Sequence, residues 1–205
     1  MINRVVLNET SYFGRGSRSK LTEELKMRGY EKVLLVSDQT LKEAGVTQQI
    51  INLLEEANVT YFEFNHIKPN PTVGNVQEGL GVAQTNGIDA IVTVGGGSVI
   101  DTAKAISIIM TNPEHSGVTS LAGAVETRNK GIPLFALPTT AGTAAEVTIN
   151  YVITDEVNMK KMVCIDVHDI PVCSIIDPDL MQGMPQQLAA STGMDALTHA
   201  MEGYI

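Results

Sequence analysis

The stretch Ala90-Ile-Val-Thr-Val-Gly-Gly-Gly-Ser98 decides the fold of this 205-residue chain. Its first five residues form a mostly apolar, β-branched run that is typical of a buried strand, and a helical pattern follows to about Met110. Ser98 is the expected N-cap of this helix, and Asp101 is expected to face the same terminus. Glycines here let the backbone approach a ligand, and the helix amino terminus favours an anion such as pyrophosphate. A tight structural turn is the alternative, although three consecutive glycines carry an entropic cost that a turn alone does not require.

Short strand-like runs alternate with helical patterns on both sides of this segment. Further strands are expected at 33–36, 61–64 and 132–137, and helices at 21–28, 47–57 and 72–84, with Thr72 as a cap. This alternation predicts an α/β fold with a Rossmann-like parallel sheet flanked by helices. Alternating residues over 147–154, followed by strand-like runs at 162–165 and 172–176, predict an added β-ribbon and then a return to the sheet.

A break at Met184-Pro-Gln-Gln187 separates this pattern from the end of the sequence. Every residue from Gln186 onward is compatible with a helix, and small residues in that stretch allow close packing. We therefore expect one α/β domain over residues 1–185 and the start of a second domain over residues 186–205.

The composition narrows the class of protein. The formal net charge of −9 argues against nucleic acid or an anionic membrane as a partner. Hydrophobic residues make up 43%, which supports a full core, and no apolar stretch is long enough to span a bilayer. Cys164 and Cys173 lie in apolar runs and are expected to be buried reduced thiols. The first residues lead into strand-like sequence rather than a signal peptide, so we expect a soluble cytoplasmic protein.

Two further segments carry candidate ligand-binding groups. Asp38 follows the strand at 33–36, where a carboxylate can accept hydrogen bonds from ribose hydroxyls and repel a 2′-phosphate, which favours NAD over NADP. It can equally cap a helix that starts near Thr40. The run Pro138-Thr-Thr-Ala-Gly-Thr-Ala-Ala-Glu146 follows another strand, and its hydroxyls at Thr139, Thr140 and Thr143 could bond phosphate or carboxamide groups. An ordinary Thr-rich loop with helix caps is the alternative.

A candidate metal pair lies in Gly193-Met-Asp-Ala-Leu-Thr-His-Ala-Met-Glu202. Asp195 and His199 are one helical turn apart on the same face. Such a pair is often a surface pair, but the small and apolar residues around it predict a buried face, where a metal ion would satisfy the carboxylate. Two protein ligands are fewer than a tightly held metal ion normally needs.

The other histidines and a second glycine pair carry weaker signals. His66 and His115 fall in loops, and His168 lies in Asp166-Val-His-Asp169, which we expect to be a solvated turn. Gly14-Arg-Gly-Ser17 is the nearest match to the Gly-x-Gly-x-x-Gly dinucleotide pattern. Because Ser19 stands at its third glycine position, we expect a turn there.

Three of these segments, in this order, resemble the signatures of the iron-containing (group III) alcohol dehydrogenases. The run Gly95-Gly-Gly-Ser-Val-Ile-Asp-Thr-Ala-Lys104 looks like the glycine-rich signature of that family. The run from Pro138 to Thr148 looks like its second signature, and the run from Gly193 to Glu202 looks like its metal helix. The resemblance covers essentially the whole chain. A relative of glycerol dehydrogenase or dehydroquinate synthase is the alternative, and the full Thr-Thr-Ala-Gly-Thr-Ala-Ala-Glu run argues against it.

The resemblance implies an NAD-binding α/β domain followed by an all-helical metal-binding domain. It implies that the adenosine ribose is contacted by Asp38, the adenine side by Asn70, and the pyrophosphate by Gly96, Gly97 and Ser98. It places on the phosphate and nicotinamide side Thr139, Thr140, Thr143, Asn150 and Lys161, with Leu180 packed nearby. It makes Asp195 and His199 the first two ligands of Fe²⁺, or alternatively Zn²⁺. The two other ligands of the family are histidines of a segment that this sequence does not include.

The reaction implied by the resemblance is the interconversion of a small aldehyde and an alcohol, of the lactaldehyde/1,2-propanediol type, by hydride transfer from NADH. The metal would act as a Lewis acid, and no side chain stands out as the proton donor. The alternative is a catalytically inactive NAD-binding fragment, because two ligands are missing. The resemblance also implies a homodimer formed through an N-terminal strand at about Asn3–Leu7.

Overall fold

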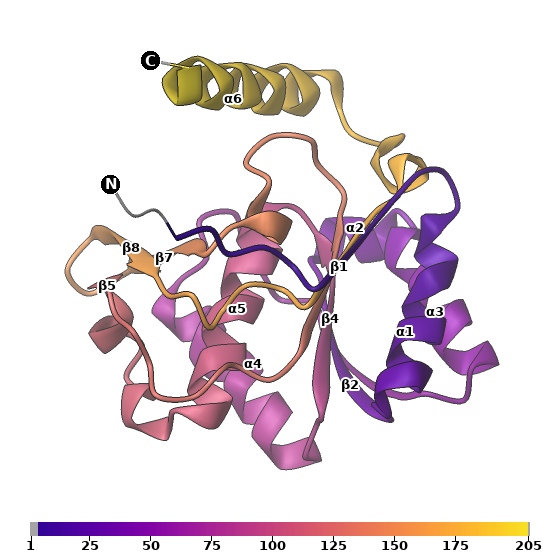
Figure 1. Cartoon of the computed structure of the whole chain (residues 1–205), viewed down its shortest axis with the longest axis horizontal. Coiled ribbons are helices and arrows are strands. Elements are labelled where there is room, and N and C mark those ends of the chain that lie inside the picture. Colours follow the sequence, from indigo (N-terminus) through magenta and orange to yellow (C-terminus); the bar gives the residue numbers. More distant parts are fainter. Residues whose placement is uncertain (1–3, 205) are drawn as a thin grey trace.

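Six parallel strands form the central sheet, in the order β1-β9-β6-β4-β2-β3. The structure, a computed structural model, describes residues 4–204 (Figure 1). The strands of this sheet are β1 (Thr10–Phe13), β2 (Lys32–Val36), β3 (Thr60–Phe64), β4 (Ala90–Gly95), β6 (Leu134–Pro138) and β9 (Cys173–Ile176). The predicted parallel α/β sheet is therefore confirmed.

Helices connect the strands and cover both faces of the sheet (Figure 1). The α-helices are α1 (Lys20–Arg28), α2 (Gln39–Glu43), α3 (Val46–Glu56), α4 (Val73–Asn86), α5 (Gly97–Thr111) and α6 (Gln186–Tyr204). Short 3-10 turns are η1 (Ser17–Ser19), η2 (Pro113–His115), η3 (Thr119–Leu121), η4 (Ala145–Val147) and η5 (Pro178–Met181). Thr72 caps α4 as predicted, because its hydroxyl accepts from the Asn75 N–H and the Asn75 side chain reaches back to the Thr72 N–H.

Strand β2 shows how the sheet separates two hydrophobic cores. Leu34 and Val36 point into the core that also holds residues of α4 and α5. Val33 and Leu35 point into the opposite core, which holds residues of α1 and α3. A strand buried on both faces reads as a continuous apolar run, which is why the sequence pattern located it. Each such side chain contributes about 1.5–3 kcal/mol when it is buried.

The predicted β-ribbon is a separate three-stranded sheet. Strand β7 (Asn150–Asp155) pairs antiparallel with β8 (Lys160–Ile165), and β5 (Gly123–Ala124) pairs with the other side of β8. Tyr151 and Ile153 of β7 are buried in the core that contains α5, so the ribbon packs against that helix. The strand starts later than the sequence pattern indicated, because residues 145–147 form η4.

The N-terminal segment differs from the prediction. Asn3 lies outside the described residues, and residues 4–8 form no strand; the first strand is β1. Val5 and Leu7 are 78% and 72% exposed. A strand forms only where a partner supplies backbone hydrogen bonds, and among residues 4–204 no strand pairs with residues 4–8. The predicted pairing of this segment with a second copy of the chain stays a prediction. Cys164 and Cys173 are buried free thiols, as predicted.

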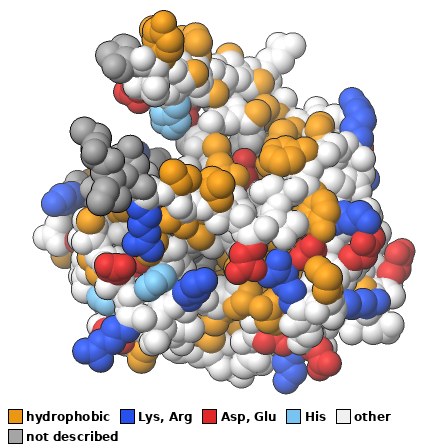
Figure 2. All heavy atoms as spheres, viewed as in Figure 1, with side chains coloured by type: hydrophobic (Ala, Val, Ile, Leu, Met, Phe, Trp, Pro, Cys, Tyr) orange, Lys and Arg blue, Asp and Glu red, His pale blue; other side chains and the backbone are white. Residues whose placement is uncertain are grey.

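Helix α6 lies apart from the two cores, above the rest of the chain in Figure 1. None of its residues is buried. Met194, Leu197 and Met201 share one helical stripe and are 62%, 52% and 58% exposed, and hydrophobic side chains are visible on the surface of this helix in Figure 2. Within residues 4–204, every helix is too short or too polar to cross a lipid bilayer.

Candidate cofactor and metal site

The strand order places a topological switch point at the carboxyl ends of the central strands. After β2 the chain turns to one side of the sheet and continues to β3, whereas after β4 it turns to the other side and continues to β6. The loops that follow β2 and β4 therefore diverge. In parallel α/β sheets, ligands bind in the crevice at such a point.

The glycine turn after β4 lies at this switch point. Gly96 is the N-cap of α5, so the prediction that Ser98 is the cap was wrong. Among residues 4–204 no side chain caps this helix start, so the N–H groups of Gly97 and Ser98 are available to an anion. An added Cβ on Gly96 would lie 3.0 Å from Thr140 Oγ1, and one on Gly97 would lie 3.2 Å from Thr143 Oγ1. The absence of side chains thus lets two hydroxyls approach the turn.

The Thr-rich loop after β6 lies beside the glycine turn. Gly95 and Pro138 are register partners at the ends of β4 and β6, and the Thr139 N–H donates to the Gly95 carbonyl at 3.1 Å. Thr139 is buried, while Thr143 is exposed. The structure thus brings together the glycine turn and three threonines that lie more than 40 positions further along the sequence.

Asp38 lies at the end of β2, next to β4 in the sheet. Its Oδ1 accepts from the Leu41 N–H at 2.9 Å, so it caps α2. The side chain is partly exposed. The capping role occupies one carboxylate oxygen and is compatible with a second role at the ribose.

Two other candidate residues meet directly. The Lys161 Nζ donates to the Asn70 Oδ1 at 2.8 Å, which joins the ribbon to the loop before α4. Asn150 pairs with Ile165 and Lys161 pairs with Thr154, so Asn150 and Lys161 lie at opposite ends of the β7–β8 pair. At about 3.3 Å per residue, their backbones are roughly 13 Å apart.

Leu180 and Ser98 complete the candidate set. Leu180 is only 3% exposed and packs in the core with α1 and α3. Its side chain therefore packs in the core beneath the end of the sheet and offers no free surface to a ligand. Ser98 lies in the first turn of α5, and its carbonyl accepts from the Thr102 hydroxyl at 2.8 Å.

Buried charges lie behind the site and were not expected from the sequence. The prediction that Asp101 faces the start of α5 was wrong, because its Oδ2 accepts from the Val152 N–H at 3.0 Å. Burial raises the pKa of Asp101 to about 6 and that of Asp169 to about 8. Lys104 is fully buried on the same helix, and burial lowers the pKa of its amine. The motif run that ends at Lys104 contains both Asp101 and Lys104, and these charges within a mostly apolar helix were a signal from which the cluster could have been predicted.

The turn Asp166-Val-His-Asp169 is not the solvated loop that the sequence predicted. Asp166 is 3% exposed and Asp169 is 2% exposed. Asp166 accepts from the Thr127 hydroxyl at 2.6 Å, whereas both carboxylate oxygens of Asp169 lack hydrogen-bond partners within residues 4–204. The two carboxylates are buried, whereas Val167 and His168 between them are partly exposed.

The predicted metal pair is exposed rather than buried. The side chains of Asp195 and His199 are 42% and 54% exposed, and His199 Nε2 lies 3.9 Å from Asp195 Oδ1. Within residues 4–204 the predicted buried face is not formed, because α6 packs on few neighbours, and the metal ligation stays a prediction. Carboxylate and imidazole are suitable donors for Fe²⁺ or Zn²⁺. Among the described residues, however, no group of three or more such donors could hold a metal ion.

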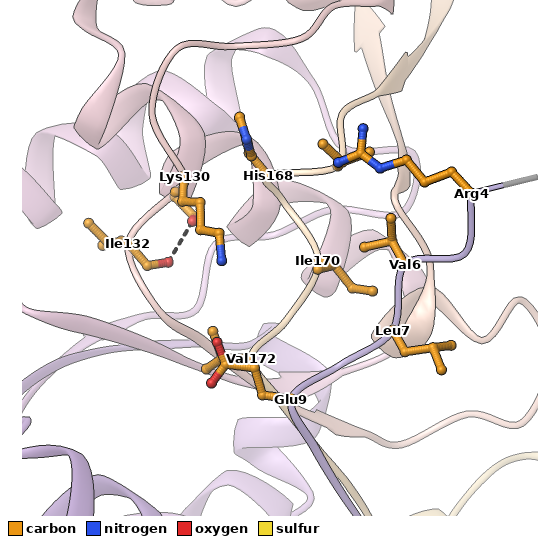
Figure 3. Close-up of a pocket in the computed structure, with 12 residues that line it drawn as sticks. Arg4, Val6, Leu7, Glu9, Lys130, Ile132, His168, Ile170 and Val172 are labelled. Atoms are coloured by element: carbon orange, nitrogen blue, oxygen red, sulfur yellow. Dashed lines mark hydrogen bonds between the residues drawn. The ribbon is translucent and has the colours of Figure 1, made fainter.

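A cavity of about 220 Å³ lies elsewhere, between the N-terminal segment and the loops around Lys130 and His168 (Figure 3). Val6 and Leu7 border it on one side, and the hydrogen bond from the Ser107 hydroxyl to the Ile132 carbonyl crosses its wall. None of the candidate cofactor or metal residues lines this cavity. It is therefore separate from the glycine turn and the Thr-rich loop.

Comparison with known proteins finds matches over nearly the whole chain. The sequence profile of the iron-containing alcohol dehydrogenase family matches residues 8–178. The chain is 53% identical to lactaldehyde reductase of Escherichia coli K12 over 205 residues, which are 100% of this chain and 54% of that protein. Alcohol dehydrogenase from Oenococcus oeni superposes with a TM-score of 0.93 at 38% identity and covers 98% of this chain and 52% of its own.

A further solved relative contains a dinucleotide. Sulfoacetaldehyde reductase from Bifidobacterium kashiwanohense, in complex with NAD⁺, superposes with a TM-score of 0.88 at 29% identity over 100% of this chain and 54% of its own. The chain thus spans about half the length of the relatives that it matches.

Proposed function

Because this chain belongs to the iron-containing alcohol dehydrogenase family, we propose that it is the NAD-binding part of a metal-dependent oxidoreductase. The reaction is the interconversion of a small aldehyde and an alcohol by hydride transfer, of the lactaldehyde/1,2-propanediol type. The substrate class comes from the likeness to lactaldehyde reductase. The proposal divides the chain into an NAD-binding domain over residues 1–185 and the start of a helical metal-binding domain over residues 186–205.

One observation carries the NAD part of the proposal. The glycine turn and the Thr-rich loop meet at the carboxyl ends of β4 and β6, with Thr140 and Thr143 next to the start of α5. This arrangement supplies helix N–H groups and hydroxyls to a pyrophosphate. Asp38 would bind the adenosine ribose and repel a 2′-phosphate. The joined pair Asn70–Lys161 and, at the other end of the ribbon, Asn150 would contact the rest of the cofactor.

Asp195 and His199 are proposed as two of the metal ligands. A bound Fe²⁺, or alternatively Zn²⁺, would supply Lewis acidity toward the substrate carbonyl. Residues 4–204 bring no third donor to this pair, so further donors are needed for tight binding. For that reason the 205-residue chain by itself is proposed to bind NADH and to be inactive. A cytoplasmic location and a homodimer also remain proposals.

The test measures binding and turnover separately. NADH binding to the 205-residue chain is followed by nicotinamide fluorescence, with Thr140→Val as the site variant and Thr85→Val, at an exposed position of α4, as the matched control. We expect only Thr140→Val to weaken binding. Lactaldehyde-dependent NADH oxidation with added Fe²⁺ is then compared with that of a longer chain extending beyond residue 205. No NADH binding by the wild-type chain would refute the proposal, and turnover by the 205-residue chain would refute its inactivity.

A further inference from the structure

Lys104 is a fully buried cation, with 0% of its surface exposed, in the middle of α5. Its Nζ contacts three oxygens of one short segment: the Thr148 carbonyl at 2.6 Å, the Thr148 hydroxyl at 3.3 Å and the Asn150 carbonyl at 2.9 Å. An ammonium has three donors, so this arrangement uses all of them. A buried lysine is rare because leaving water is costly for its charge, and an apolar side chain would fill the same space more cheaply.

The segment that Lys104 holds is the junction between the Thr-rich loop and the ribbon. Thr148 follows η4, and Asn150 is the first residue of β7. Three residues before Lys104, Asp101 accepts from the Val152 N–H at 3.0 Å. Helix α5 thus holds the start of the ribbon at two points, through Lys104 and Asp101. The same helix begins at the glycine turn.

The charges around Lys104 favour a stable contact between its ammonium group and the ribbon junction. Burial lowers the pKa of its amine, and the carboxyl groups of Asp169, Asp101 and Glu146 oppose that effect. Asp169 offers two oxygens that have no hydrogen-bond partner among the described residues. The cluster therefore places charged side chains behind the ribbon junction. Apolar packing alone would need no charged side chain there.

We propose that Lys104 is a positioning residue for the cofactor. By holding the Thr148 and Asn150 carbonyls against α5, it sets the place of the Asn150 side chain relative to the glycine turn. Asn150 then meets the nicotinamide end while the start of α5 holds the pyrophosphate. The inference rests on the proposed NAD function and extends it to a residue that lies beneath the site.

The experiment compares two ligands that share the pyrophosphate. NADH contains the nicotinamide riboside, whereas ADP lacks it. In the 205-residue chain, Lys104→Met keeps the length of the side chain and removes its donors. Losing the hydrogen bonds that place Asn150 should weaken NADH binding about tenfold. ADP binding, measured by calorimetry, should change less than about twofold, because ADP does not contact Asn150. Lys104→Gln, which keeps a neutral donor, should restore part of the NADH affinity.

Ser107→Ala is the matched control. Ser107 is also buried on α5 and bonds a backbone carbonyl, that of Ile132, away from the ribbon junction. It should lower stability without changing the ratio of NADH to ADP affinity. Equal losses of both affinities in Lys104→Met, or an unchanged NADH affinity, would overturn the positioning role.

Asn150→Ala keeps the inference testable if Lys104→Met does not fold. Asn150 is exposed, so its truncation leaves the core intact. The inference requires the same selective loss of NADH affinity, and wild-type NADH affinity in Asn150→Ala would overturn it. If the wild-type chain binds ADP and NADH equally poorly, the proposed function fails, which is a different outcome from a failure of the role of Lys104.

Discussion

At the scale of single residues, Asp38 combines a structural and a proposed binding role. Its carboxylate caps α2 through the Leu41 N–H, and it lies at the strand end where a ribose would bind. Sequence reasoning could not choose between these roles, because both use a short acidic side chain at the same position. The structure shows that the capping role exists and that Asp38 is partly exposed.

A pair of substitutions at Asp38 separates the two roles. Asp38→Ser retains a good N-cap and removes the negative charge, whereas Asp38→Gly also removes the cap bond. We expect both variants to lower the preference for NADH over NADPH about tenfold, which corresponds to ~1.4 kcal/mol. Dissociation constants from fluorescence titration provide the measurement. An unchanged NADH/NADPH ratio in Asp38→Ser would remove the ribose role.

Asp177 shows how one buried carboxylate connects distant turns. It is fully buried and accepts from the Arg18 guanidinium at 2.7 Å, the Gly16 N–H at 3.1 Å and the Asp179 N–H at 3.1 Å. Burial raises its pKa, but these hydrogen bonds outweigh burial and hold the pKa below the ordinary value. The turn predicted at Gly14–Ser17 is thereby joined to η5.

Asp177→Asn should lower the free energy of unfolding by about 1.5–3 kcal/mol at pH 7. Because the folded-state pKa is depressed, this stabilisation is fully present above the unfolded pKa near 3.8 and is lost as the pH falls through the folded pKa. The difference between wild type and variant should therefore shrink below about pH 4. Urea unfolding at several pH values measures it.

Arg15→Gln is the control for this effect. The Arg15 side chain is 73% exposed in its ion pair with Asp179, so its loss should change stability by less than about 1 kcal/mol. A pH-independent difference for Asp177→Asn would contradict the assigned role of its charge.

At the scale of elements, the packing of α4 on α5 depends on Gly79. An added Cβ there would lie 2.6 Å from Ile106 Cδ1 and 2.8 Å from Phe64 Cε1. The helical pattern of the sequence located α4 but did not show which of its glycines faces a neighbour. That distinction depends on how closely α4 approaches α5 and β3, which no local pattern encodes.

Gly79→Ala should lower the free energy of unfolding by about 1–3 kcal/mol, because the added methyl overpacks the core. Gly81→Ala is the matched control on the same helix, since no heavy atom lies within 4 Å of its added Cβ. It should raise stability by about 0.5–1 kcal/mol through helix propensity. Chemical denaturation of both variants checks the pair. Equal effects at the two positions would contradict the close approach of α4 and α5.

At the scale of the whole molecule, the placement of α6 depends on a contact with the Thr-rich loop. An added Cβ on Gly142 would lie 2.9 Å from Thr192 Cβ and 3.1 Å from the Thr192 carbonyl oxygen. The loop that contains Gly142 rises toward α6 in Figure 1. This contact links the proposed cofactor loop to the helix that carries Asp195 and His199.

Gly142→Ala should displace α6 and increase proteolytic cleavage in the connection at residues 182–186. Gly193→Ala is the control within α6, because its added Cβ meets no atom within 4 Å. Limited proteolysis followed by mass spectrometry measures the rate of cleavage. We expect an increase of a fewfold for Gly142→Ala, on the order of 1 kcal/mol in the opening equilibrium. Equal cleavage of both variants would show that the contact does not hold α6.

The sequence by itself located the alternating strands and helices from about residue 21 onward and the glycine turn, but it did not locate β1 or α2. Periodicity and turn residues act over a few positions, so Ala90–Val94 and the cap at Thr72 could be located without a structure. The resemblance of three ordered motifs also identified the family correctly.

Only the tertiary structure decided burial and long-range partners. In the structure, Asp195 and His199 are exposed, and Asp166 and Asp169 are buried. Asp101 accepts a hydrogen bond from the ribbon. Burial depends on which elements from distant parts of the chain pack together, and one local sequence can lie on a surface or in a core. The contacts of Lys104 with the ribbon span more than 40 residues of sequence. They exist because the sheet places α5 beneath the ribbon, which no spacing within the motif specifies.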